Sequence, residues 1–191
     1  MHPRTVLSRS PALSTSPSPA PVAQELVQLH AHARDKADAI AQAAQMLVAA
    51  GCVAPGYQAS MGRREELANT FLGHGVAIPH GMGEDRHLVR RDGLAVLQLP
   101  DGVEWNPGQT TRLVVAIAAQ SDTHITLLRR LTRLIQDPAA LQTLFTTDDS
   151  GVIVAALNGD AAPAAPAAPA TDLAERFDWS VTYPNGLHAR P

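Results

Sequence analysis

Apolar side chains recur every three to four positions in several stretches of the chain, which is the period of a helix buried on one face. Over Asp35–Ala50, the residues Ile40, Ala44 and Leu47 share such a face, so the pattern predicts an amphipathic helix. A second, shorter helix is expected from Tyr57 to about Glu66. Further helices are expected from Ser121 or Asp122 to Ile135, from Pro138 to Leu144, and over Asp149–Leu157.

Shorter, mostly apolar runs have the length of buried strands. They cover Val76–Ile78, Leu94–Leu99 and Leu113–Ala119. Asp101-Gly102, which follows the run Leu94–Leu99, has the chemistry of a turn. Because helices alternate with these strands, the sequence predicts an α/β domain whose sheet is covered on both faces. We expect that domain to occupy residues 22–158.

The two ends of the chain have compositions that do not support a packed core. Residues 1–21 are rich in Pro and Ser and contain no acidic residue, which is typical of a disordered tail. Residues 159–175 contain a repeated Ala-Ala-Pro, so we interpret them as a semi-rigid linker. Beyond that linker, Phe177–Tyr183 alternates apolar and polar residues as a strand does.

Composition narrows the classes of partner. Hydrophobic residues make up 45% of the chain, which allows a packed core, and the formal net charge is -3. This near-balance argues against nucleic acid or an anionic membrane surface as the main partner. No apolar run approaches the roughly 20 residues of a membrane-spanning helix, so we expect no direct membrane insertion. The single cysteine, Cys52, excludes an internal disulfide, is expected to be a small buried hydrophobe, and fits a reducing compartment such as the cytoplasm.

The segment Gly75–Gly81 carries the strongest chemical signal. An apolar strand stops at Pro79, which has no N–H to continue a ladder and keeps the preceding residue extended. His80 follows at once, and Gly81 and Gly83 allow the backbone to turn away and to approach a ligand. A histidine at the end of a rigid strand, with glycine on its far side, is accessible to a reactant from outside.

Three interpretations of the histidines in this region are open at this point. His74, His80 and His124 could ligate zinc for a hydrolytic reaction, although no H-x-H, H-E-x-x-H or cysteine pairing has ligand spacing. They could be ordinary residues, and for His74 and His87 we expect surface loops. One of them could instead be a nucleophile. His124 falls in the first turn of a predicted helix, where the helix dipole keeps an imidazole neutral.

The segment Gly75–Gly81 also resembles the active-site segment of a known family, the fructose/mannitol-type enzyme IIA domain of the bacterial phosphoenolpyruvate:sugar phosphotransferase system. The likeness covers nearly all of residues 22–158, with matching order and spacing. The other matching motifs are Lys36…Asp38-Ala39-Ile40, Met61-Gly62-Arg63-Arg64-Glu65-Glu66, Gly102-Val103-Glu104-Trp105 and Ile117-Ala118-Ala119-Gln120-Ser121-Asp122-Thr123-His124.

This resemblance implies both a fold and a set of site residues. The family fold is a three-layer α/β/α sandwich with a mixed β-sheet. His80 matches the family's phosphorylated histidine, His124 matches a second active-site histidine that orients it, and Arg64 matches an arginine that can hold phosphate oxygens. Backbone N–H groups of Gly81 and Gly83 could add to that hold. The relay step of the family needs no metal and no cofactor, so we expect neither.

The end of the chain carries a second resemblance. Pro184–Pro191 is similar to the phosphorylation motif of HPr, the small histidine phosphocarrier of the same system. His188 matches its phosphorylated histidine, and Arg190 matches the neighbouring residue. We therefore expect residues 176–191 to be the truncated start of an HPr domain, in a fusion of the enzyme IIA–HPr kind.

Together the resemblances imply a phosphotransferase that carries phosphate on a histidine. It would accept phosphate from phospho-HPr on His80 and pass it to a sugar-specific enzyme IIB, with fructose as the expected sugar by analogy with fusions of this type. One alternative is a regulatory enzyme IIA-type sensor that binds other proteins according to its phosphorylation state. Another is a chain that is inactive in isolation and acts only within the full fusion.

Overall fold

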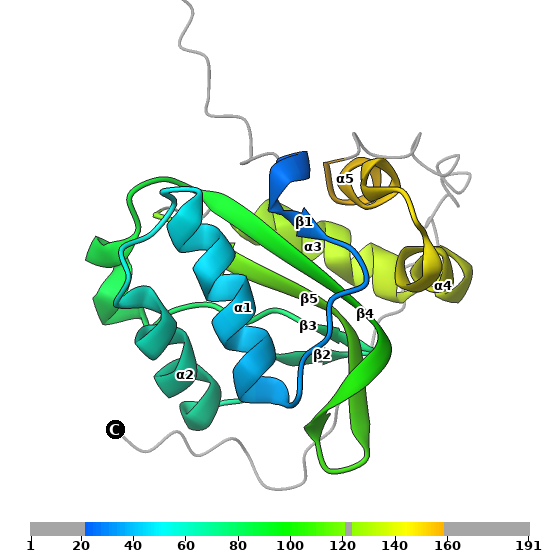
Figure 1. The fold of residues 1–191 in the computed structure, drawn as a ribbon, viewed down its shortest axis with the longest axis horizontal. Helices are drawn as coiled ribbons and strands as arrows, with labels where there is room; N and C mark the ends of the chain where they lie inside the picture. The colour runs from blue at the N-terminus through cyan, green and yellow to red at the C-terminus, as the bar shows by residue number, and fades with distance from the viewer. Residues whose placement is uncertain (1–21, 121–123, 159–191) are drawn as a thin grey trace, which may run out of the picture. The chain divides into compact units, whose positions relative to one another are not determined.

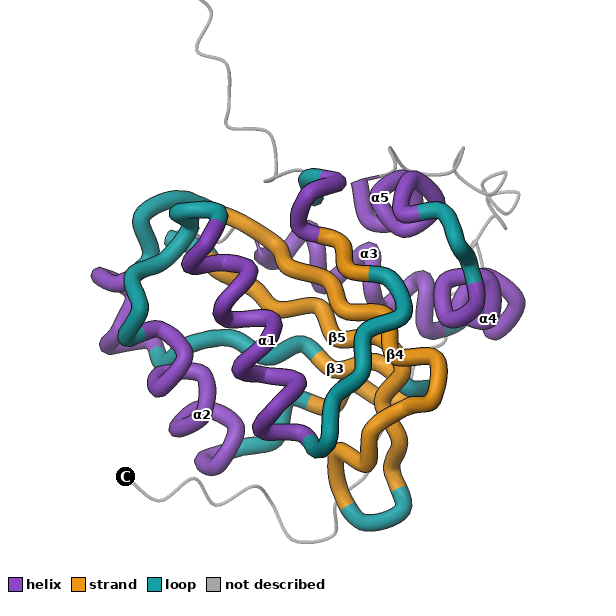
Figure 2. The backbone as a smooth tube through the Cα atoms, viewed as in Figure 1, coloured by secondary structure: helices purple, strands orange, loops and turns teal. Residues whose placement is uncertain are grey.

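The computed structural model describes residues 22–120 and 124–158, with the backbone alone for residues 124–127. The chain divides into two compact units, Met1–Gly159 and Asp160–Pro191, and every described residue belongs to the first. Figures 1 and 2 show the described unit as a central sheet with helices on both sides. The expected tail (1–21), the linker (159–175), the HPr-like residues (176–191) and the helix cap at Ser121 or Asp122 lie outside the described residues.

The described elements mix helices and strands, as predicted, but they come in groups and do not alternate strictly along the chain. The α-helices are α1 (Lys36–Ala49), α2 (Tyr57–Leu67), α3 (His124–Ile135), α4 (Pro138–Thr146) and α5 (Ser150–Asn158). The strands are β1 (Val27–Gln28), β2 (Phe71–Gly73), β3 (Val76–Ala77), β4 (Gly93–Asn106) and β5 (Gln109–Ala118), and two short 3-10 helices are η1 (Gln24–Leu26) and η2 (Gly83–Leu88).

Side-chain caps explain where two of the helices begin. The Asp35 carboxylate accepts a hydrogen bond from the Asp38 N–H at 2.8 Å, which satisfies one of the free donors in the first turn of α1. The Asp137 carboxylate does the same for Ala139 and Ala140, at 3.1 and 3.0 Å, in the first turn of α4. The predicted break between α3 and α4 at Asp137 is therefore confirmed.

The five strands form one mixed sheet in the order β1-β4-β5-β3-β2. The pairs β1–β4 and β3–β5 are parallel, and the pairs β4–β5 and β2–β3 are antiparallel. Because β3 and β5 run in the same direction, their carboxyl ends meet at one edge of the sheet. The chain continues from that edge into the His80 segment on one side and toward α3 on the other.

Two hydrophobic cores, one on each face of the sheet, make the domain a three-layer α/β/α sandwich, which confirms the predicted fold class. Helices α1 and α2 cover one face and α3, α4 and α5 cover the other (Figure 1). The strands supply alternate residues to the two cores, since Leu97 and Ala116 face α1 while Val96 and Val115 face the opposite helices. Cys52 is buried in the first core, as expected.

The turn predicted at Asp101-Gly102 is wrong. Strand β4 continues through these residues to Asn106, and the hairpin to β5 closes at Pro107-Gly108 instead. The pairing register with β5 shifts at this point, and Gly102 has a φ of 72°. Gly102 therefore marks a bulge within a long strand, which needs the same backbone freedom as a turn.

No helix among the described residues is both long enough and apolar enough to cross a membrane.

Candidate functional site

His80 lies at the carboxyl edge of the sheet, directly beyond β3. It forms an isolated parallel bridge with Ile117 near the end of β5. The Ile117 N–H donates to the carbonyl oxygen of Pro79 at 2.9 Å, so the proline contributes its acceptor although it has no donor. In open α/β sheets, ligands bind beyond the carboxyl ends of parallel strands, which is the position of His80.

The His80 ring is oriented by a hydrogen bond to its own strand. Its Nδ1 atom lies 2.9 Å from the carbonyl oxygen of Ile78. A carbonyl oxygen only accepts, so Nδ1 carries the proton in this contact. In the neutral ring, the lone pair that can attack an electrophile is then on Nε2.

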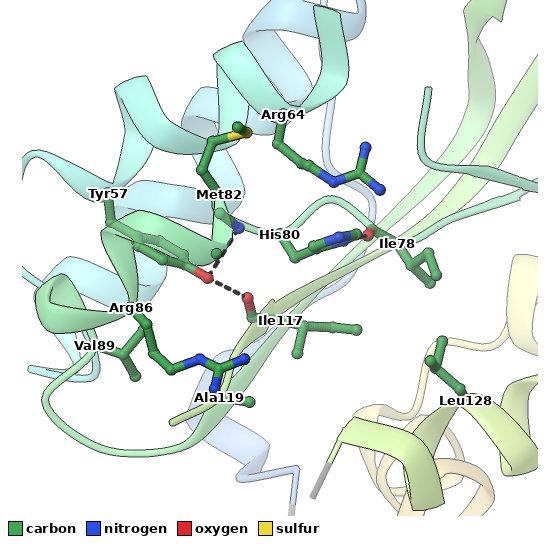
Figure 3. A pocket seen from close by; sticks show the side chains of 12 residues that line it. Tyr57, Arg64, Ile78, His80, Met82, Arg86, Val89, Ile117, Ala119 and Leu128 are labelled. Atoms are coloured by element: carbon green, nitrogen blue, oxygen red, sulfur yellow. Dashed lines mark hydrogen bonds between the residues drawn. The ribbon is translucent and has the colours of Figure 1, made fainter. Parts of the chain in front are cut away.

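A pocket of about 310 Å³ opens beside the His80 ring (Figure 3). Its walls combine apolar side chains with two arginines and with the backbone that follows the histidine. The lining residues are Tyr57, Arg64, Ile78, His80, Gly81, Met82, Gly83, Arg86, Val89, Ile117, Ala119 and Leu128. They come from α2, η2, α3 and the ends of β3 and β5, so the pocket lies where several elements converge.

Two guanidinium groups supply positive charge to the pocket. Arg64 extends from α2 alongside the His80 ring, and one of its nitrogens, Nη1, donates to the carbonyl oxygen of Ala68 at 2.6 Å. Arg86 reaches the pocket from η2, on the side where Ala119 lies (Figure 3). A planar guanidinium can bind two oxygens of a phosphate at once, so this pair suits a tetrahedral anion.

The loop after His80 is held by the first turns of α2. The Tyr57 hydroxyl accepts from the Gly81 N–H at 3.0 Å and donates to the Ile117 carbonyl at 2.7 Å. The Ser60 hydroxyl accepts from the Met82 N–H at 2.8 Å. The Gly81 N–H thus has a partner in Tyr57, and the roles of the Gly81 and Gly83 N–H groups in phosphate binding stay predictions.

Gly81 has a steric reason to be glycine. A Cβ at this position would lie 2.5 Å from a ring carbon of Tyr57 and 3.0 Å from the Ser60 hydroxyl. The glycine thus allows the backbone to pack against α2, whereas the sequence suggested close approach to a ligand.

The end of α2 that carries Arg64 is fixed by a buried carboxylate. Glu65, whose side chain is 5% exposed, accepts from both the N–H and the hydroxyl of Thr70, at 2.8 and 2.5 Å. Its other oxygen accepts from the indole N–H of Trp105 at 3.0 Å and lies 3.2 Å from the Lys36 ammonium. Four donors from three other parts of the chain therefore converge on the residue next to Arg64.

His124 is the first residue of α3, as the sequence suggested for the first turn of that helix. Leu128, which lines the pocket, follows one helical turn later, so the spacing puts the two residues on the same face of α3. The His124 side chain lies outside the described residues, and so does His188. Their roles stay predictions.

His74 and His87 do not line the pocket beside His80. His74 and His87 are exposed in loops or short turns, as expected. Among the side chains that the structure describes, no group of three or more His, Cys, Asp or Glu residues could hold a metal ion.

Sequence reasoning missed three residues that shape the site: Tyr57, Ser60 and Arg86. Tyr57 and Ser60 have no chemical motif around them, and only the fold brings them to the His80 loop. Arg86 had a weak signal, because it follows His80 by six residues in a glycine-containing segment. The 3-10 turn of η2 returns it to the pocket.

Comparison with known proteins identifies the class to which this fold and pocket belong. Residues 21–159 match the family model described as "Phosphoenolpyruvate-dependent sugar phosphotransferase system, EIIA 2". The chain belongs to this family, and its described unit is an enzyme IIA phosphotransferase domain, as the resemblance predicted.

Several relatives are larger proteins. The chain is 81% identical over 177 residues to a multiphosphoryl transfer protein of Xanthomonas campestris pv. campestris, a match that covers 93% of this chain and 21% of the relative. It is 55% identical over 163 residues to a multiphosphoryl transfer protein of Rhodobacter capsulatus, with 85% of this chain and 20% of the relative covered. The chain thus spans about one fifth of the length of these two relatives.

Two shorter chains match over nearly their whole length. The mannitol-specific phosphotransferase enzyme IIA component of Geobacillus stearothermophilus is 31% identical over 135 residues, which are 71% of this chain and 93% of that protein. Enzyme IIAMTL of Escherichia coli, solved in a complex with phosphorylated enzyme IIBMTL, superposes with a TM-score of 0.68 at 32% identity. That match covers 73% of this chain and 98% of the solved one.

Proposed function

We propose that the domain relays a phosphoryl group through His80, accepting it from phospho-HPr and passing it to a sugar-specific enzyme IIB. The observation that carries this proposal is the 2.9 Å contact between His80 Nδ1 and the Ile78 carbonyl, which leaves the lone pair of the neutral ring on Nε2 beside the arginine-lined pocket. Membership of the enzyme IIA family supports the class of reaction.

In the first step, the Nε2 lone pair attacks the phosphorus in line with the bond to the donor nitrogen. A bond from Nε2 to phosphorus forms while the bond from phosphorus to the donor histidine breaks, and the donor nitrogen keeps the electron pair. In the second step the same exchange transfers the group to the acceptor on enzyme IIB, a cysteine in this family. Both steps depend on positioning and charge stabilisation, with little proton transfer for the protein to catalyse.

Arg64 and Arg86 have the chemistry to stabilise the transferred group. Three oxygens of the phosphoryl group share its negative charge during transfer, and guanidinium donors on two sides can bind them in a fixed geometry. We assign His124 to the orientation of His80 or of its phosphate. Its place at the start of α3 supports this role, because the free N–H groups and the dipole of a helix N-terminus favour a neutral imidazole and a nearby anion.

The sugar and the partners are part of the proposal. We retain fructose as the expected sugar, by the analogy with fusions of this type, although these two shorter relatives are named for mannitol. The presence of an enzyme IIB in the complex of the solved Escherichia coli relative supports the choice of acceptor. The relay is expected to operate in the cytoplasm, because phosphoenolpyruvate is a metabolite of that compartment.

For the whole chain, we propose a tail over 1–21, the enzyme IIA domain over 22–158, a linker over 159–175 and the start of an HPr domain over 176–191. Residues 160–191 are about one sixth of the chain, so a match that covers 93% of it includes part of this segment. The similarity to a multiphosphoryl transfer protein beyond the enzyme IIA domain supports a fusion, in which a tethered donor at His188 would raise the local donor concentration.

A transfer assay tests the function. The 191-residue chain is mixed with separately purified HPr that carries a radiolabelled phosphoryl group, and acid-labile label on the chain is measured over time. We expect the wild-type chain to take up label and His80→Ala to take up none on residues 22–158, while circular dichroism shows that the variant is folded. Equal uptake on residues 22–158 in the two chains would show that His80 is not the carrier.

A further inference from the structure

The parallel pairing of β3 with β5 continues past the end of β3, in the same register, to an isolated bridge between His80 and Ile117. In a parallel bridge between His80 and Ile117, two bonds are expected: from the Ile117 N–H to the Pro79 carbonyl, and from the Gly81 N–H to the Ile117 carbonyl. The first bond is present at 2.9 Å. The second is relayed by the Tyr57 hydroxyl, which lies between its donor and its acceptor at 3.0 and 2.7 Å (Figure 3).

The position of Tyr57 in the fold places its hydroxyl between Gly81 and Ile117. It is the first residue of α2 and is 4% exposed, with its ring packed against Gly81. Burial raises the pKa of the Tyr57 hydroxyl, so the group keeps its proton at neutral pH and can donate it to the Ile117 carbonyl. The same oxygen then has lone pairs for the Gly81 N–H.

We propose that Tyr57 is a positioning residue for the phosphoryl relay. Its hydroxyl bridges the Gly81 N–H and the Ile117 carbonyl, which fixes the backbone directly after His80 and thereby orients the His80 ring. This inference rests on the proposed function of His80. The backbone of His80 is then fixed on both flanks, by the ladder bond from Ile117 to Pro79 on one side and by the Tyr57 relay on the other.

Removal of the hydroxyl alone has a defined consequence. In Tyr57→Phe the ring still fills the space against Gly81, but the Gly81 N–H and the Ile117 carbonyl lose their common partner. They either stay without it or close on each other and complete the ladder. In the first case the Gly81 backbone loses its anchor to β5, and in the second it moves toward β5; either change alters the position of the adjacent His80 ring.

The test compares Tyr57→Phe with the wild-type chain in single-turnover phosphorylation by saturating phospho-HPr. We expect the rate of uptake on His80 to fall on the order of tenfold, because small misplacements of a nucleophile are costly, while the HPr concentration for half-maximal rate changes less than about twofold. In ¹⁵N NMR spectra of the unphosphorylated variant, we expect altered His80 ring shifts and faster exchange of the Gly81 amide proton.

Gln98→Met is the matched control for a loss of stability without a change at the site. Gln98 is buried, and its side chain accepts from the His30 N–H and donates to the carbonyls of Leu144 and Thr147. It pairs with Leu113, four residues before Ile117 on β5. This variant should be less stable than wild type but should keep its rate of uptake and its His80 ring shifts.

The outcomes of these experiments separate the role of Tyr57 from the proposed function of His80. A folded Tyr57→Phe with the wild-type rate and unchanged His80 shifts would overturn the role of Tyr57, and so would equal losses of rate in Tyr57→Phe and Gln98→Met. A wild-type chain that takes up no phosphate would instead refute the proposed function. If Tyr57→Phe does not fold, the wild-type Gly81 amide decides: exchange as fast as that of an exposed amide would contradict the relay.

Discussion

The Nδ1 atom of His80 lies 2.9 Å from the carbonyl oxygen of Ile78, two residues earlier in the chain. Because the acceptor belongs to the backbone of the strand end, the ring orientation is set by the same extended segment that Pro79 enforces. The contact determines which nitrogen of the ring is protonated in its neutral form, and so which nitrogen can become phosphorylated.

We expect the phosphoryl group on Nε2 of His80. Attack through Nδ1 would require the ring to give up the Ile78 contact, whereas attack through Nε2 keeps it. Two-dimensional NMR of the ¹⁵N-labelled, phosphorylated chain distinguishes the two isomers by the coupling of phosphorus to one ring nitrogen. Coupling to Nδ1 would contradict the orientation derived from the Ile78 contact.

His124→Ala should keep the ability of His80 to accept phosphate but should slow the onward step. A neutral imidazole at the start of α3 can orient the phosphorylated ring without adding charge, and the acceptor needs that orientation for in-line attack. The measurement is the rate of phosphate loss from the prephosphorylated chain to purified enzyme IIB. Onward transfer at the wild-type rate would remove His124 from the mechanism.

Arg64→Gln and Arg86→Gln should each lower the rate of phosphate uptake by roughly tenfold to a hundredfold, since each removes a charged donor from the transferred group. Arg90→Gln is the matched control, because Arg90 is exposed close to Arg86 in the sequence but does not line the pocket. Single-turnover rates with phospho-HPr are the measurement. A control variant as slow as the other two would point to a general electrostatic effect.

The elements with a strong hydrophobic period were predictable from the sequence. The ends of α1, α2, α4 and α5, and the last residue of α3, agree with the expected bounds to within two residues. Their apolar faces must meet the sheet, and residues such as Asp137 cap them. The short strands β1 and β2 were not predicted. At two and three residues they are too short to show a period, and the sheet recruits them through pairing with β4 and β3.

The site was predictable only where it depends on a local motif. His80 is identified by the proline and glycine that flank it, and Arg64 by the resemblance to the family. Tyr57 and Ser60 act through hydrogen bonds that span 24 and 22 residues, and no local pattern encodes a contact of that range. The same limit applied to Gly81, whose glycine is required by the packing of the Tyr57 ring rather than by a ligand.

Glu65→Gln should destabilise the domain by about 1–3 kcal/mol, although it preserves the shape of the side chain. The Glu65 carboxylate faces four donors: the N–H and hydroxyl of Thr70 on one oxygen, and the Trp105 indole with the Lys36 ammonium on the other. Whichever way the amide of glutamine turns, its NH₂ group replaces an oxygen that faces two donors, so these contacts lose their acceptor. Urea unfolding at neutral pH measures the change, and Glu66→Gln, exposed on the next position of α2, should stay within about 0.5 kcal/mol of wild type. Equal stabilities for the two variants would mean that the convergence of donors on Glu65 contributes nothing to holding α2, and with it Arg64, against the sheet.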